Sequence, residues 1–106
     1  MYIVIETTTD SKPIAKNIVN EILQHDLSPC VHTIENITSD YKWENKAISS
    51  KEILIRIKTN SLLMNDIIKI IKKLHNYDIP ELISYRIDIN SNQYNKWFDE
   101  SLKKWN

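Results

Sequence analysis

The sequence contains no glycine, and this absence excludes several kinds of site. Phosphate-cradling P-loops, GxGxxG dinucleotide turns and GxSxG nucleophile elbows all need glycine at fixed positions. Tight turns must therefore be made by Asn, Asp or Ser. Cysteine is nearly absent as well. With Cys30 alone, the chain can form neither an internal disulfide nor a CxxC metal or redox motif.

Long apolar runs and an excess of charge are also lacking. No run approaches the roughly 20 apolar residues that span a membrane, and residues 1–6 lack the basic region of a signal peptide. The 14 Lys and Arg residues balance 14 Asp and Glu residues, so no broad field attracts nucleic acid or an anionic membrane. We therefore expect no nucleic-acid or membrane partner. A single cysteine also suits a reducing compartment, the cytoplasm.

What remains is the composition of one ordinary globular domain over residues 1–106. Hydrophobic residues make up 42% of the chain and charged residues 26%. Ile, Val, Leu and aromatic residues recur along the whole length, so disorder is not expected.

Apolar periodicity predicts a strand and then a helix at the start of the chain. Residues 2–9 are apolar and then rich in threonine, which suits a pleated strand. Asp10 and Ser11 are both N-cap residue types, and Pro13 fits the first turn of a helix. Helical spacing of apolar residues continues to about residue 25 or 26, and Pro29 ends the helix.

A long hairpin follows. Residues 30–43 have an extended pattern in which Asn36 is a candidate bulge, and residues 44–46 form a candidate turn. Residues 52–58 alternate isoleucine with other residues, as in a strand with one buried face.

The second half of the chain repeats the order of helix and strand. Asn60 and Ser61 can cap an amphipathic helix to residue 74, and residues 82–89 predict a fourth strand. Ser91 or Asn92 then caps a last helix, whose apolar positions extend to Trp105. The order βαββαβ with an added helix predicts an α+β, ferredoxin-like fold: a four-stranded antiparallel sheet with two helices on one face.

A ferredoxin-like fold does not by itself determine function, so the function must be inferred from the residues at candidate sites. The strand of residues 52–58 lacks the stacking aromatics of an RNA-recognition domain. No CxxC is available for a soft-metal chaperone, and no Gly- and Arg-rich loop follows the first strand to hold a phosphate. Ser, His and Asp are all present, but no spacing singles out a hydrolytic triad.

Four segments, taken in order, resemble one known family. They are Cys30-Val31-His32 at the start of a strand, YKWENK at residues 41–46, the strand positions Glu52, Leu54 and Lys58-Thr59, and the loop HNYDIPEL at residues 75–82. Together they look like the CutA divalent-cation tolerance family. The resemblance implies a small, non-enzymatic, cytoplasmic protein that assembles as a homotrimer similar to P-II-type signalling trimers. Copper binding has been proposed for this family.

The metal-ligand candidates are His75, Glu6, His32 and Cys30. Imidazole suits Cu(II) or Zn(II), the expected cations, and a carboxylate can complete such a site. Glu6 stands where some members of the family carry a cysteine implicated in copper binding. Each candidate also has a structural interpretation. His75 can cap a helix C-terminus, and His32 and Cys30 can be ordinary strand residues.

A second candidate site is a ligand cleft formed by Lys58, Glu81, Tyr77 and Trp43. We expect Lys58 and Glu81 to pair there, either around a ligand or to fix a subunit contact. Tyr41 and Trp43 lie near the hairpin tip and are hard to bury in one small domain, so we expect them at the trimer interface. A P-II-like regulator, a small cleft enzyme and a purely structural trimer remain alternatives.

Overall fold

The computed structural model describes residues 1–103. The elements follow the expected order: β1 (Tyr2–Thr9), α1 (Lys12–Gln24), β2 (Cys30–Trp43), β3 (Lys46–Asn60), the 3-10 turn η1 (Ser61–Leu63), α2 (Met64–Leu74), β4 (Ile83–Arg86) and α3 (Asn92–Glu100). Within the described residues, no helix is long and apolar enough to cross a membrane.

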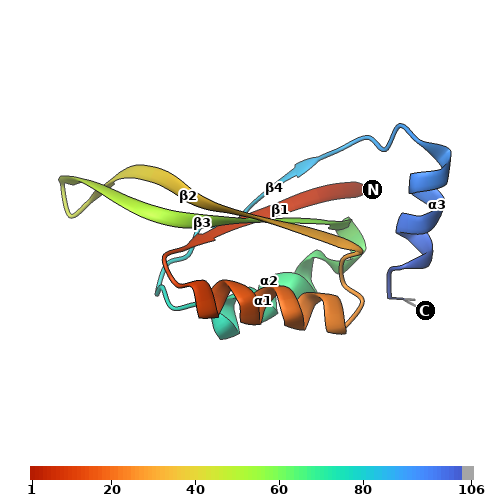
Figure 1. The fold of residues 1–106 in the computed structure, drawn as a ribbon, viewed down its shortest axis with the longest axis horizontal. Coiled ribbons are helices and arrows are strands. Elements are labelled where there is room, and N and C mark those ends of the chain that lie inside the picture. The colour runs from red at the N-terminus through yellow and green to blue at the C-terminus, as the bar shows by residue number, and fades with distance from the viewer. Residues whose placement is uncertain (104–106) are drawn as a thin grey trace.

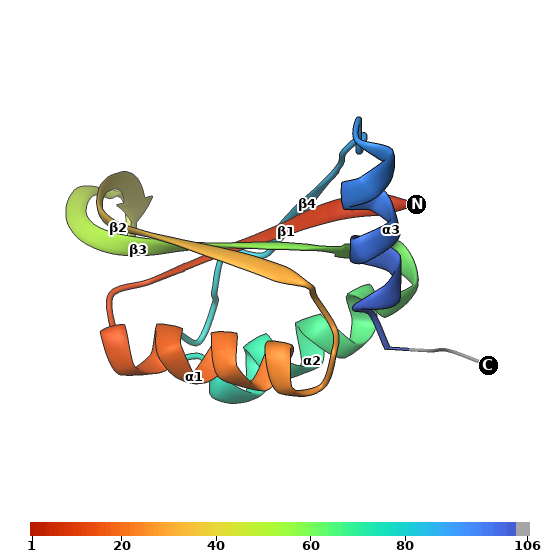
Figure 2. The same ribbon diagram turned by 45° about the vertical axis from the view of Figure 1, so that its right-hand side comes forward.

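The four strands form one antiparallel sheet in the order β2-β3-β1-β4, which confirms the ferredoxin-like α+β fold. Helices α1 and α2 pack beneath one face of the sheet, and α3 lies at the end that carries the N-terminus (Figure 1). The β2–β3 hairpin extends far beyond the other two strands (Figure 2). One sheet face is therefore covered by helices, whereas nothing in residues 1–103 forms a second layer on the opposite face.

The core lies between the sheet and the helices. Its fully buried side chains come from strands and helices alike: Ile5, Ile18, Ile22, Ile55, Ile57, Leu63, Ile67, Ile71 and Phe98. Strand residues reach this core at every second position and helix residues at every third or fourth, which is why the apolar pattern of the sequence predicts the layers.

Local chemistry explains the element boundaries in a chain without glycine. The Ser11 side chain accepts a hydrogen bond from the Ile14 amide (3.3 Å) and so caps α1 as predicted. Asn36 has φ 62° at the register shift between Ile34 and Ile37, which confirms the bulge in β2. Glu44 and Asn45 turn the hairpin at φ 51° and 64°, the left-handed region in which Asn is the best tolerated non-glycine residue.

The fourth strand is shorter than predicted. It pairs with β1 only from Ile83 to Arg86, and the amide of Ile87 donates one further bond to the Tyr2 carbonyl (3.1 Å). The chain then leaves the sheet toward α3, so residues 87–89 pack without a partner strand (Figure 1). Ser91 caps α3 as predicted, whereas Trp105 lies outside the described residues.

Candidate functional sites

The uncovered sheet face gathers three of the four predicted metal-ligand residues. Cross-strand pairing joins His32 to Arg56, Arg56 to Glu6 and Glu6 to Ile83, so these four residues form one row across the sheet. Cys30 lies on the same face as His32, two positions earlier on β2. Shared strand parity thus brings these residues to one surface.

Glu6 is engaged in an ion pair on this face. Its Oε2 accepts hydrogen bonds from Arg56 Nε (2.8 Å) and from the Tyr85 hydroxyl (2.8 Å). Burial alone would raise the pKa of Glu6, but the two hydrogen bonds and the Arg56 charge outweigh burial and lower the pKa. The same bond to Glu6 raises the pKa of Arg56. A cation that binds Oε2 of Glu6 would have to displace the guanidinium.

Both ring nitrogens of His75 are also engaged. Nδ1 accepts a hydrogen bond from the Tyr77 amide (3.0 Å), so Nε2 carries the proton and donates to the Thr8 carbonyl (2.9 Å). Because neither nitrogen has a free lone pair, the ring fastens the loop after α2 to the end of β1. Its backbone amide closes the last turn of α2 on Ile71 (2.9 Å), but the ring bonds to Thr8 and Tyr77 and does not itself cap the carbonyl groups of α2.

Cys30 and His32 are the only two of the four candidates whose functional atoms approach each other. Cys30 Sγ lies 3.6 Å from His32 Nε2. Cys30 is half-buried and His32 is exposed, on β2 at one edge of the sheet. Within residues 1–103, no group of three or more His, Cys, Asp or Glu residues converges on a point where a metal ion would fit.

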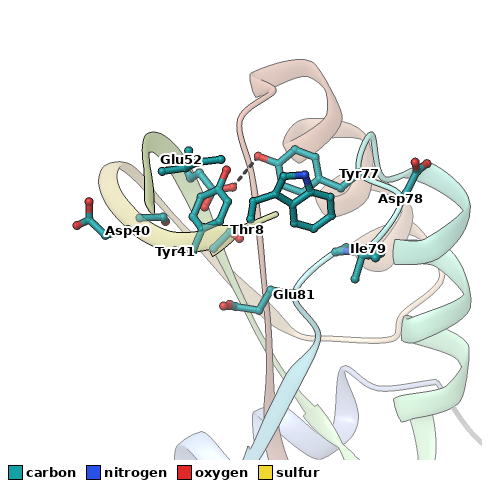
Figure 3. Close-up of a pocket in the computed structure, with 12 residues that line it drawn as sticks. Thr8, Asp40, Tyr41, Glu52, Tyr77, Asp78, Ile79 and Glu81 are labelled. Carbon is teal, nitrogen blue, oxygen red and sulfur yellow. Dashed lines mark hydrogen bonds between the residues drawn. The ribbon is translucent and has the colours of Figure 1, made fainter. Parts of the chain in front are cut away.

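A pocket lies under the curled hairpin, where the loop after α2 approaches β2 and β3 (Figure 3). Its volume is about 710 Å³. The lining includes Tyr77, Trp43 and Glu81 from the predicted cleft, together with Tyr41. Thus three of the four predicted cleft residues meet, although they come from segments more than 30 positions apart.

The predicted pair of Lys58 with Glu81 is wrong. Lys58 is not part of the pocket. Its Nζ lies 3.5 Å from the Tyr94 hydroxyl and 5.7 Å from the centre of that ring, at the other end of β3. Lys58 and Glu52 point to the same side of β3 but are six residues apart, which is about 20 Å along a strand.

Glu52 is the carboxylate that the sequence interpretation missed as a site residue. It is only 7% exposed, and its Oε2 accepts a hydrogen bond from the Tyr77 hydroxyl (2.6 Å). Burial and this bond to Glu52 raise the pKa of Tyr77. The signal was an acidic residue inside a strand that alternates with buried isoleucines, since a glutamate is seldom buried without a partner.

Glu81 stands at the open side of the same pocket (Figure 3). Burial raises its pKa, and the negative charges of Glu6 and Glu52 raise it further. Glu6 and Glu52 thus place negative charge near Glu81.

Comparisons with known proteins agree with this fold over nearly all of the chain. A family model described as "CutA1 divalent ion tolerance protein" matches residues 3–101. The chain belongs to the CutA1 family.

Individual relatives support the same assignment. The chain is 34% identical over 101 residues to "Protein CutA, chloroplastic" of Arabidopsis thaliana, covering 95% of this chain and 56% of that protein. It is 26% identical over 98 residues to the "Divalent-cation tolerance protein CutA" of Thermus thermophilus, covering 92% and 95%. The chain thus spans just over half the length of the plant relative and nearly all of the bacterial one.

Solved CutA1 structures superpose closely on the chain. The structure of CutA1 from Oryza sativa matches with a TM-score of 0.92 at 31% identity, over 98% of this chain and 95% of that one. CutA1 from Pyrococcus horikoshii matches with a TM-score of 0.88 at 31% identity, over 96% and 99%. The names of the family and of the bacterial relative describe tolerance to divalent cations, and neither name mentions a catalytic activity.

Proposed function

We propose that this CutA1-family chain acts in divalent-cation tolerance as a non-enzymatic binding protein. In this proposal Cys30 and His32 take the cation, and the pocket under the hairpin takes a small ligand. The observation that supports the metal role is the 3.6 Å separation of Cys30 Sγ and His32 Nε2. Of the other two candidates, His75 already uses both ring nitrogens in contacts within the chain, and Glu6 uses its Oε2.

A thiolate and an imidazole form a donor pair that suits copper and zinc. Two ligands in one subunit leave the coordination shell incomplete, so solvent or a second subunit must supply the rest. Such an open site exchanges metal readily, which suits sensing or buffering better than a structural role. Protons compete for both ligands, so binding should weaken as the solution is acidified.

Calorimetric titration tests the metal role, with Zn(II) beside Cu(II) because Zn(II) does not oxidise the thiol. We expect Cys30→Ser and His32→Ala each to weaken binding at least about tenfold, as loss of one ligand does. His25→Ala is the matched control, because His25 is exposed and contacts only Glu21 (3.0 Å). Binding that survives both variants but is lost in His75→Ala would place the site in the loop after α2. Absence of binding below millimolar metal would contradict a direct role.

We further propose that the protein assembles as a homotrimer with Tyr41 and Trp43 at the subunit contacts. Tyr41 is 45% exposed and Trp43 50% exposed in the single chain. Strands β2 and β4 are unpaired sheet edges, and such edges are aggregation hazards unless another chain covers them. Closed rotational symmetry removes them without leaving an open end.

A second candidate is a P-II-like regulator or small cleft enzyme that responds to a ligand other than a metal. The pocket under the hairpin supports it, because a concave site with acidic and aromatic walls is a place for a molecule larger than an ion. Ligand binding that needs no divalent cation would favour this candidate over direct metal binding.

A further inference from the structure

The loop between α2 and β4 is held in place by hydrogen bonds of its first three residues. His75 donates from Nε2 to the Thr8 carbonyl (2.9 Å) and accepts the Tyr77 amide at Nδ1 (3.0 Å). The side chain of Asn76 donates to Asp10 (2.8 Å) and so adds a further link to the end of β1. Among these residues only the histidine is of a type that changes charge between about pH 5 and 8.

The bond between the His75 ring and the Tyr77 amide needs a neutral ring. A ring nitrogen accepts a hydrogen bond only through a free lone pair, and Nδ1 uses its lone pair for this amide. Protonation of Nδ1 makes two N–H groups face each other, so this bond is lost. The bond from Nε2 to the Thr8 carbonyl survives, because a charged ring is the stronger donor. A proton therefore separates His75 from Tyr77 but not from β1.

The surroundings of the ring allow it to take up this proton. His75 is only half-buried, so solvent reaches it. It follows the C-terminus of α2, where a helix favours a positive charge. The charged groups on the surrounding elements are Asp10 after β1, Glu52 on β3, Lys72 and Lys73 on α2, and Asp78 and Glu81 in the loop. Acidic groups thus outnumber basic ones, which stabilises a charged imidazole and offsets part of the cost of the lost bond.

Tyr77 matters because it covers a buried carboxylate. Glu52 is only 7% exposed and accepts a hydrogen bond from the Tyr77 hydroxyl (2.6 Å), which Figure 3 shows as a dashed line. In the described part of the chain, no other side chain forms a hydrogen bond with Glu52. The rings of His75 and Tyr77 also pack together, with centroids 4.8 Å apart. A change at His75 is therefore passed directly to the cover of Glu52.

We propose that His75 is a pH-sensitive switch that loosens the start of the loop between α2 and β4 in acid. In the neutral state the ring holds the Tyr77 amide, and Tyr77 covers Glu52. As the pH falls through the range in which imidazoles gain a proton, the amide is released and water reaches Glu52.

This switch is separate from the roles proposed above. Thr8, the anchor of His75, pairs with Leu54 on β3, whereas Cys30 pairs with Lys58, four positions further along the same strand. The switch requires neither a metal ion nor a ligand in the pocket. It also leaves the exposed rings of the hairpin available for subunit contacts.

Hydrogen exchange of the Tyr77 amide tests the proposal, measured by NMR on the full chain in metal-free buffer. After correction for the intrinsic rate, we expect exchange to be about tenfold faster at about pH 5.5 than at about pH 7.5, as loss of one hydrogen bond allows. The ring protons of His75 should titrate with the same midpoint as this change. The His75 amide is the internal control and should stay protected, because it bonds to the Ile71 carbonyl in α2 (2.9 Å).

Variants assign the effect to one ring. His75→Asn keeps an acceptor for the amide two residues on but does not titrate, so the pH dependence of Tyr77 exchange should disappear. His25→Asn and His32→Asn are matched controls, because both histidines are exposed, and each should retain the pH dependence. Glu81→Gln should retain it as well. This variant removes the loop carboxyl group whose pKa is raised by burial and by nearby negative charge.

Two outcomes would overturn the inference. If the His75 ring titrates while exchange of the Tyr77 amide stays constant or changes at a different midpoint, the ring does not control the loop. If the pH dependence persists in His75→Asn or disappears in Glu81→Gln, a carboxyl group is responsible. Should His75→Asn leave the Tyr77 amide unprotected at both pH values, the two wild-type midpoints decide: agreement supports the switch, and disagreement contradicts it.

Discussion

Two fully buried threonines show how far a single hydroxyl group can differ in its contribution to stability. Thr59 Oγ1 donates a hydrogen bond to the Leu27 carbonyl (2.6 Å), which ties β3 to the segment after α1. Thr7 is equally buried, on β1, but its Oγ1 has no hydrogen-bonding partner in the described part of the chain. Burying a hydroxyl group that has no hydrogen-bonding partner destabilises the folded state, whereas a hydrogen bond offsets part of the cost of burial.

We therefore expect opposite effects from the same substitution at these two positions. Thr7→Val should raise the free energy of unfolding by about 0.5–1 kcal/mol, and Thr59→Val should lower it by about 1–2 kcal/mol. Urea unfolding followed by tryptophan fluorescence, at one protein concentration for all variants, measures both. Destabilisation by Thr7→Val would show that its hydroxyl has a partner in solution, such as a bound water molecule.

At the scale of elements, the β2–β3 hairpin is the part of the molecule that carries the sites. The Asn36 bulge and the turn at Glu44 and Asn45 shape it, and its curled end forms one wall of the pocket. Glu44 has φ 51°, a backbone angle that costs free energy in any residue with a Cβ atom. Asn and Asp offset part of this cost through local hydrogen bonds of their short side chains, which glutamate lacks.

The turn gives a prediction at this scale. Glu44→Asn should stabilise the hairpin by a few tenths to about 1 kcal/mol, because Asn is the better residue at positive φ. Hydrogen exchange of the amides beside the turn should slow by about twofold to fivefold. Lys46→Asn is the matched control: Lys46 is exposed, lies in β3 and has no positive φ, so Asn there should bring no gain. Equal slowing in both variants would contradict this account of the turn.

At the scale of the whole molecule, the single chain has an extended shape and an incomplete layer structure. It measures 46 × 27 × 20 Å because the hairpin projects from the body. The uncovered sheet face exposes Ile83 (49%) and Tyr85 (42%), and the hairpin exposes Tyr41 and Trp43. Apolar side chains gathered on the uncovered sheet face and on the projecting hairpin favour association with further copies of the chain.

Light scattering should therefore give about three times the chain mass of 12.6 kDa. Trp43→Ala should shift the protein toward monomer at micromolar concentration. Trp97→Ala is the matched control, because Trp97 is similarly exposed (45%) but lies on α3. A wild-type monomer would contradict the trimer, and equal loss of assembly in both variants would place the contact elsewhere.

The amino-acid sequence by itself determined the elements, their order and several of their ends. Strand and helix periods, the Ser11 and Ser91 caps, the Asn36 bulge and the turn before Lys46 depend on residues a few positions apart, so they can be read along the chain. The length of β4 could not be read in this way. Its alternating pattern continues to Ile89, but a strand lasts only as long as its partner strand lies beside it.

The sites were decided by tertiary structure. The period of a strand places Glu52 and Lys58 on one side of β3. It does not show which end of that strand meets the loop after α2. The sheet register answers this and puts Glu52, not Lys58, against Tyr77. Sequence likewise named His75 as a ligand candidate. Only folding brings the Thr8 carbonyl and the Tyr77 amide to its two ring nitrogens, because hydrogen-bonding partners distant in sequence are set by packing.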